Sequence, residues 1–212
     1  MRIFYTLLVI LLTVLFSHIS PQHLFAESRS KASAPSVQAQ LKEADESFYF
    51  DGKAIHPGCV RRFNVGLADS PPPVVRSVDV AACVSSNENY EPFKTSDDGY
   101  VSYEYDLDEG EKGYFAYRYL GKTGSGLHVL DTRSNEGGTM VAMTVFLIDF
   151  NTGNYLTFSE EAKGKKDERL IMSCTGQITR GDRDTGTVML EGNELTLGAS
   201  QYRDKNKIIT LD

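Results

Sequence analysis

The chain has 212 residues, 22 basic and 29 acidic side chains, and a formal net charge of -7 at pH 7. An acidic surface repels phosphates and anionic headgroups, so the composition argues against a nucleic-acid partner and against electrostatic docking on a membrane. The length suits one domain with a sizeable core, and no internal repeat divides it.

Residues 1–26 have the layout of a secretory signal peptide. Arg2 precedes an apolar run over 7–16, and Ala26 supplies a small residue at the expected cleavage site. The apolar run is shorter than the roughly 20 residues that cross a bilayer core. We therefore expect a secreted or periplasmic protein that is soluble, with no membrane insertion after cleavage.

Residues 27–46 carry Ser, Ala, Gln and mixed charge, with almost no large apolar side chain. Such a segment cannot bury enough apolar surface to offset the entropy lost on ordering. The sequence therefore predicts a flexible linker over 27–46, with at most a marginal helical turn around 37–44. A single globular domain is expected over 47–212.

Within that domain, short β-branched and aromatic runs alternate with polar residues and are separated by Gly, Asn and Asp. The run 100–107 alternates strictly, which indicates a half-buried strand, whereas the run 140–150 is apolar on both faces and indicates a central strand. No apolar repeat at helical spacing follows Phe48. The sequence predicts an all-β antiparallel domain, a two-sheet sandwich in preference to a closed barrel.

The three cysteines differ in their positions. Cys83 falls on the polar face of an expected strand over 75–84, and a bridge from it to Cys59 is expected in an oxidising compartment. Cys174 falls on the apolar face of its strand, which predicts a buried free thiol. The competing interpretation makes Cys59 a nucleophile with His56 as its base; it is disfavoured because exported cysteines are more often bridged.

Aromatic side chains are dense in the expected hairpin 100–119. Tyrosine has a rigid apolar body and a polar tip, which suits a glycan or protein contact surface, although the same rings also stabilise sheets as cross-strand pairs. Alternation points Tyr114 and Arg118 outward and turns Phe115, Tyr117 and Tyr119 toward the core. Candidate binding residues are Tyr114, Arg118 and Tyr100.

Signals for catalysis, metals and cofactors are weak. After signal cleavage only His56 and His128 remain, and Asp131 points away from His128 on their common strand, which indicates a structural histidine. The acidic turn 106–111 offers oxygens for calcium, but Gly110 falls too early for an EF-hand loop, which favours a solvated turn. The sequence predicts no catalytic residue, no metal and no cofactor.

The function expected from these observations is that of an exported, non-catalytic binding module. Its ligand is an unknown glycan or protein, with an inhibitor or an envelope-protecting factor as examples of such a role. The alternative is an exported hydrolase whose carboxylates come from Glu104, Asp106 and Asp131. Paired carboxyl groups of glycosidases lie about 5–5.5 Å or 6.5–9.5 Å apart, so their spacing distinguishes the two functions.

Overall fold

The computed structural model describes residues 35–64, 75–86, 92–107, 110–157 and 165–212. The expected signal peptide, 1–26, lies outside the described residues, as do residues 27–34 of the expected linker. No helix among the described residues has the length and apolar composition needed to span a bilayer.

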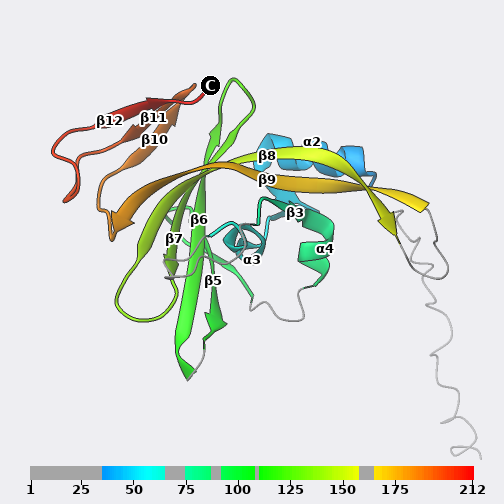
Figure 1. The fold of residues 1–212 in the computed structure, drawn as a ribbon, viewed down its shortest axis with the longest axis horizontal. Helices are drawn as coiled ribbons and strands as arrows, with labels where there is room; N and C mark the ends of the chain where they lie inside the picture. The colour runs from blue at the N-terminus through cyan, green and yellow to red at the C-terminus, as the bar shows by residue number, and fades with distance from the viewer. Residues whose placement is uncertain (1–34, 65–74, 87–91, 108–109, 158–164) are drawn as a thin grey trace, which may run out of the picture. The chain divides into compact units, whose positions relative to one another are not determined.

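The described residues form three antiparallel sheets, which confirms the all-β class (Figure 1). The largest is curled and has the strand order β3-β9-β8-β7-β6-β5-β4. Its strands are β3 (Ser77–Asp79), β4 (Lys94–Thr95), β5 (Val101–Asp106), β6 (Lys112–Lys122), β7 (His128–Asn135), β8 (Ala142–Thr157) and β9 (Lys165–Asp182). The smaller sheets are β1 (Tyr49–Phe50) with β2 (Lys53–Ala54), and β10 (Val188–Glu191), β11 (Glu194–Leu197) and β12 (Lys207–Thr210).

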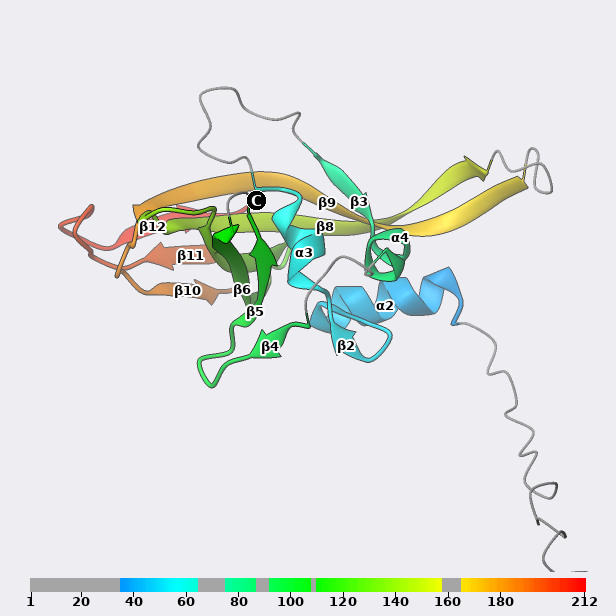
Figure 2. The ribbon, with the colours of Figure 1, turned by 90° about the horizontal axis from the view of Figure 1, so that it is seen from below.

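Strand β8 separates two apolar clusters, because its side chains alternate between the two faces of the large sheet. Phe146 and Ile148 point to the inner face, where three helices pack: α2 (Val37–Ser47), α3 (Pro57–Arg61) and α4 (Val80–Ser85) (Figure 2). Val145 and Leu147 point to the outer face and meet the three-stranded sheet. The expected central strand is thus covered on both sides, by helices on one face and by a small sheet on part of the other.

All of helix α2 except its last residue lies within 27–46, the segment that was expected to be a linker. Ser36 caps it by accepting a hydrogen bond from the Ala39 backbone N–H at 3.2 Å, and Ala44 is fully buried in the inner cluster. A short helix with few apolar residues owes its stability to packing of one face, which composition does not reveal. The compact unit therefore begins at Pro35 rather than at residue 47.

The expected strand over 75–84 changes into a helix halfway along. Strand β3 ends at Asp79, whose carboxylate accepts a hydrogen bond from the Ala82 backbone N–H at 2.9 Å and caps α4. The expectation that no helix follows Phe48 is therefore wrong. Helical spacing also turns Cys83 into the inner cluster, where it is 3% exposed, instead of onto a polar face.

The predicted disulfide between Cys59 and Cys83 is confirmed, with 5.9 Å between the Cα atoms. It joins α3 to α4, so Cys59 has no free thiol and is no nucleophile. His56 caps α3 instead, since its Nδ1 accepts a hydrogen bond from the Gly58 backbone N–H at 3.0 Å. Cys174 is free but only half-buried, and it packs against the inner cluster.

Candidate ligand-binding groove

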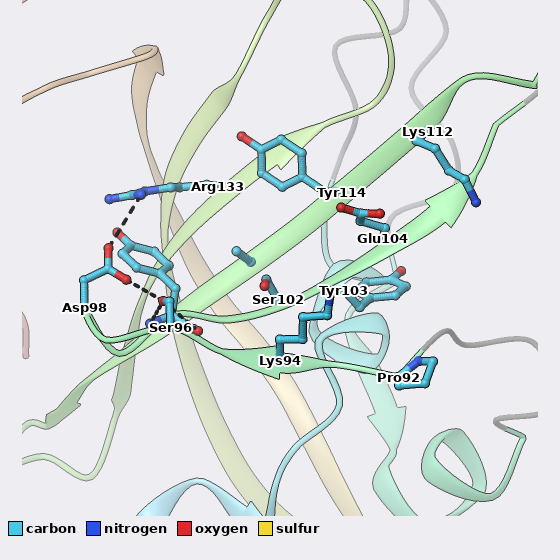
Figure 3. A pocket seen from close by; sticks show the side chains of 12 residues that line it. Pro92, Lys94, Ser96, Asp98, Ser102, Tyr103, Glu104, Lys112, Tyr114 and Arg133 are labelled. Carbon is cyan, nitrogen blue, oxygen red and sulfur yellow. Dashed lines mark hydrogen bonds and ion pairs between the residues drawn. The ribbon is translucent and has the colours of Figure 1, made fainter.

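A groove of about 620 Å³ is hollowed into the outer face of the large sheet over β4 to β7 (Figure 3). The residues that line it are Pro92, Lys94, Ser96, Asp98, Tyr100, Ser102, Tyr103, Glu104, Lys112, Tyr114, Ala116 and Arg133. This volume lies within the range of about 300–1,000 Å³ that is typical of small-molecule sites.

Two small side chains form the floor of the groove. Ser102 on β5 pairs with Ala116 on β6, and Ala116 pairs with Arg133 on β7, so the three side chains lie in one row across the sheet. Lys94 on β4 extends the row beyond Ser102. Because Ser102 and Ala116 are short, they leave a hollow between the longer side chains at the ends of the row.

Tyr114 forms a wall beside this floor. It pairs across β6 and β5 with Glu104, one row away from Ser102 and Ala116, and its side chain is half-buried. Partial burial raises the pKa of the Tyr114 hydroxyl, while the charges of Arg133 and Arg183 oppose that rise. The phenol therefore stays protonated at neutral pH and can donate a hydrogen bond beside two cationic groups.

Tyr100 lies beneath the groove rather than on its open surface. It is 4% exposed, its hydroxyl donates to Asp131 Oδ2 at 2.5 Å, and the Arg133 guanidinium stacks on its ring at 3.8 Å. Burial, together with the hydrogen bond to Asp131, raises the pKa of Tyr100 to about 12. Its hydroxyl and one ring face are thus already engaged, and Tyr100 supports Arg133.

Arg118 lies on the outer face as expected, but it does not line the groove. Its Nη2 donates to Asp131 Oδ2 at 3.2 Å, and its guanidinium lies 5.1 Å from the centre of the Tyr100 ring. Of the three candidate binding residues, the structure therefore places Tyr114 on the wall, Tyr100 beneath the groove and Arg118 in the polar contacts below it.

These contacts belong to a buried network that continues away from the groove. Arg180 donates to Asp131 Oδ1 at 2.5 Å, and Asp184 lies between Arg180 and Arg203. Burial acts to raise the pKa of Asp184, but hydrogen bonds from the Gly186 backbone N–H and from Arg203 outweigh it and lower the pKa. The network therefore ties the groove floor to the segment leading into the three-stranded sheet.

Of the carboxylates proposed for a hydrolase, Glu104 and Asp131 do not converge. Glu104 shares a row with Asn135, and Asp131 lies four residues earlier on β7, which corresponds to about 13 Å along the strand. That exceeds the separation of glycosidase pairs. Asp106, one row beyond Glu104, is ion-paired with Lys112 at 2.5 Å.

No group of three or more His, Cys, Asp or Glu side chains suited to a metal ion occurs in the part of the chain that the structure describes. The acidic turn 106–111 falls only partly within that part, because residues 108 and 109 lie outside it.

His128 is remote from the groove, on the inner face of β7. Its side chain is fully buried, with Nε2 3.2 Å from Asp45 Oδ1 on α2 and Nδ1 3.2 Å from the Tyr119 hydroxyl. Burial lowers the pKa of His128, although Asp45 acts in the opposite direction. These contacts agree with the structural role expected for His128.

Sequence reasoning missed Lys94, Ser102 and Arg133 as groove residues. Each looks ordinary along the chain, and only the register of four strands brings them into one row. The signal that was available is the small residue Ala116 between Tyr114 and Arg118, since a short side chain flanked by long ones on one strand face predicts a hollow.

No family model, curated protein or solved structure matches this chain, so the functional proposal rests on its own residues and their geometry.

Proposed function

We propose that the protein is an exported, non-catalytic module that binds a segment of glycan in the groove. The observation that carries this proposal is the hollow above Ser102 and Ala116, walled by Tyr114 and edged by hydroxyl and charged groups. A sugar ring offers an apolar face to an aromatic side chain and many hydroxyls to polar ones, and the groove supplies both kinds of partner.

A glycan fits this site better than a protein surface does. The hollow has the volume of a small-ligand site, whereas protein contacts of standard size need about 800 Å² of complementary surface on each partner. The tyrosines that suggested a broad contact surface are largely turned inward, since Tyr103, Tyr105 and Tyr117 are buried in the inner cluster.

Export is supported by two independent features. The layout of residues 1–26 is that of a signal peptide, and the Cys59–Cys83 disulfide persists best in an oxidising compartment. The absence of catalysis is supported by the spread of Glu104 and Asp131, which lie too far apart for a glycosidase pair.

The test is a glycan array probed with the full chain, followed by titration calorimetry on each hit. The variant Ala116→Leu places a branched side chain in the hollow, so it should abolish binding of the hit. The matched control Ala82→Leu makes the same change at an exposed position on α4 and should bind like wild type. Circular dichroism melts check that both variants fold.

Recovery of the hit unchanged after long incubation is expected for a binding module. Shortened oligosaccharides would instead favour the hydrolase. Equal binding by wild type and by folded Ala116→Leu would place the site elsewhere and overturn the assignment of the groove.

A further inference from the structure

Two cationic residues lie at opposite ends of the groove floor. The row Lys94, Ser102, Ala116, Arg133 crosses four strands, so a basic side chain stands at each end and a small one at each position between them. Neighbouring strands lie about 4.8 Å apart, which separates the two terminal Cα atoms by about 14 Å. Figure 3 shows Lys94 and Arg133 on opposite sides of Ser102, with the Arg133 guanidinium turned toward Asp98.

Arg133 is held in place without using up its donors. Its guanidinium stacks on Tyr100 at 3.8 Å, and Tyr100 is itself fixed by its hydrogen bond to Asp131. The nearest acid to Arg133 is Asp98, 4.0 Å away, which is too long for a hydrogen bond. Its Nε is buried and has no hydrogen-bond partner within the described residues. The guanidinium is thus oriented, and because Nε is buried, the N–H groups of Nη1 and Nη2 are the donors that can reach a ligand.

Lys94 supplies the second charge. Within the described residues it forms no ion pair, whereas Lys112, the other lysine of the groove, is paired with Asp106 at 2.5 Å. An exposed ammonium with no acid beside it attracts an anion from solution.

The acids of the groove offset part of its positive charge but leave Lys94 without an ion-pair partner within the described residues. The lining contains three cations, Lys94, Lys112 and Arg133, against two carboxylates, Asp98 and Glu104, on a chain whose net charge is -7. Asp98 is occupied within its own loop, where it accepts a hydrogen bond from the Ser96 hydroxyl, and this bond lowers its pKa. With Lys112 paired to Asp106 and Arg133 4.0 Å from Asp98, Lys94 is the cation of the lining that has no ion-pair partner within the described residues.

From this row we propose that the groove selects an acidic glycan, in which a sugar carboxylate binds between Lys94 and Arg133 while the ring lies against Tyr114. This inference rests on the proposed function and deepens it by naming the ligand class. Arg133 recognises the carboxylate through its planar fork, and Lys94 adds a point charge from the opposite side. An acidic peptide carries the same carboxylate chemistry but lacks the ring that the Tyr114 wall suits.

The test compares trigalacturonic acid with its methyl ester by titration calorimetry on the full chain. The two ligands have the same rings, and only the acid carries charge. The acid should bind at least about tenfold more tightly, because hydrogen bonds to charged groups are the stronger ones. The preference should decrease as salt is added.

Two variants test whether the charges of the row cause the preference for the acid over the ester. Lys94→Gln and Arg133→Gln should each reduce the preference for the acid severalfold while leaving affinity for the ester within about twofold. Lys207→Gln changes an exposed lysine of β12 that does not line the groove, so it should behave like wild type. If Arg133→Gln fails to fold, Lys94→Gln decides, because Lys94 is exposed and unpaired within the described residues.

Equal affinity for acid and ester in wild type would overturn the selection of an acidic glycan but leave glycan binding intact. An unchanged preference in folded Lys94→Gln would overturn the role of the row. Binding of a glutamate hexapeptide with no binding of either sugar would overturn both this inference and the proposed function.

Discussion

Asp131 receives most of the polar contacts beneath the groove. Tyr100, Arg118 and Arg180 all donate to its two carboxylate oxygens, and both Asp131 and Arg180 have side chains only 2% exposed. The attraction within a buried ion pair of this kind stabilises the fold by little more than the cost of desolvating its two charges. Loss of one partner, however, leaves the charge of the other uncompensated in the interior. Asp131 is thus a structural residue that also positions Tyr100 and, through it, Arg133.

Replacement of Asp131 by Ala should lower the free energy of unfolding by about 3–5 kcal/mol, because the buried Arg180 would lose its partner at 2.5 Å and keep only the longer pair with Asp184 at 3.6 Å. Urea denaturation followed by circular dichroism measures the change. The control is Asp106→Ala, which breaks an exposed ion pair with Lys112 and should cost less than about 1 kcal/mol. Similar losses in the two variants would show that Asp131 is not a centre of the network.

At the scale of elements, helix α2 is attached to the large sheet by both apolar and polar contacts. Its buried Ala44 packs in the inner cluster, while Asp45 contacts Lys122 at 2.8 Å and His128 at 3.2 Å. The hydrogen bond from Lys122 lowers the pKa of Asp45, so its carboxylate remains charged at neutral pH. The attachment of α2 therefore depends on a buried neutral histidine beside an ionised acid.

Acidification should weaken this attachment. Burial lowers the pKa of His128 in the folded state below the 6.5 of the free side chain, so the unfolded chain takes up the proton first. The stability due to neutral His128 is present above pH 6.5 and is lost as pH falls toward the folded-state pKa. Titration of Asp45 lies at lower pH, since its pKa is lowered from 3.8.

Melting temperature measured between about pH 8 and pH 5 tests this dependence. Wild type should lose stability over the acidic half of that range, and His128→Gln, less stable at neutral pH, should show a flatter profile. An identical slope in both proteins would mean that other groups cause the acid sensitivity.

At the scale of the whole molecule, the two apolar clusters have different support. The outer cluster joins β-sheets only, whereas the inner cluster depends on three short helices, two of which are linked by the Cys59–Cys83 disulfide. Helices of five and six residues are not stable by themselves, so this bond and the surrounding packing hold them against the sheet.

Removal of the disulfide by Cys59→Ser with Cys83→Ser should lower the free energy of unfolding by about 3 kcal/mol, since the bond closes a loop with a separation of 24 residues. Alkylation of the unfolded wild-type chain without reductant should modify one thiol, Cys174. In the folded chain that reaction should be slow, because burial raises the pKa of the Cys174 thiol. Three modified thiols in the unfolded chain would show that the disulfide does not form.

Much of the strand pattern follows from local alternation. Val101, Tyr103 and Tyr105 are buried while Glu104 and Asp106 are exposed, as period two predicts, and the doubly apolar run over 140–150 is central in the sheet. Such features depend on near neighbours in the chain and on the two-sided geometry of a strand. The disulfide partners were also predictable, although the predicted environment of Cys83 was wrong because the period changes at Asp79.

The sequence by itself therefore determined the β class, the inward and outward faces of β5 and β6, and the pairing of two cysteines. Only the tertiary structure decided that α2 belongs to the domain and that Tyr100 lies beneath Arg133. It also decided that Lys94 and Arg133 lie at opposite ends of the row through Ser102 and Ala116. Side-chain alternation is a property of one strand, whereas these contacts require the register of separate strands, which depends on the packing of the whole domain.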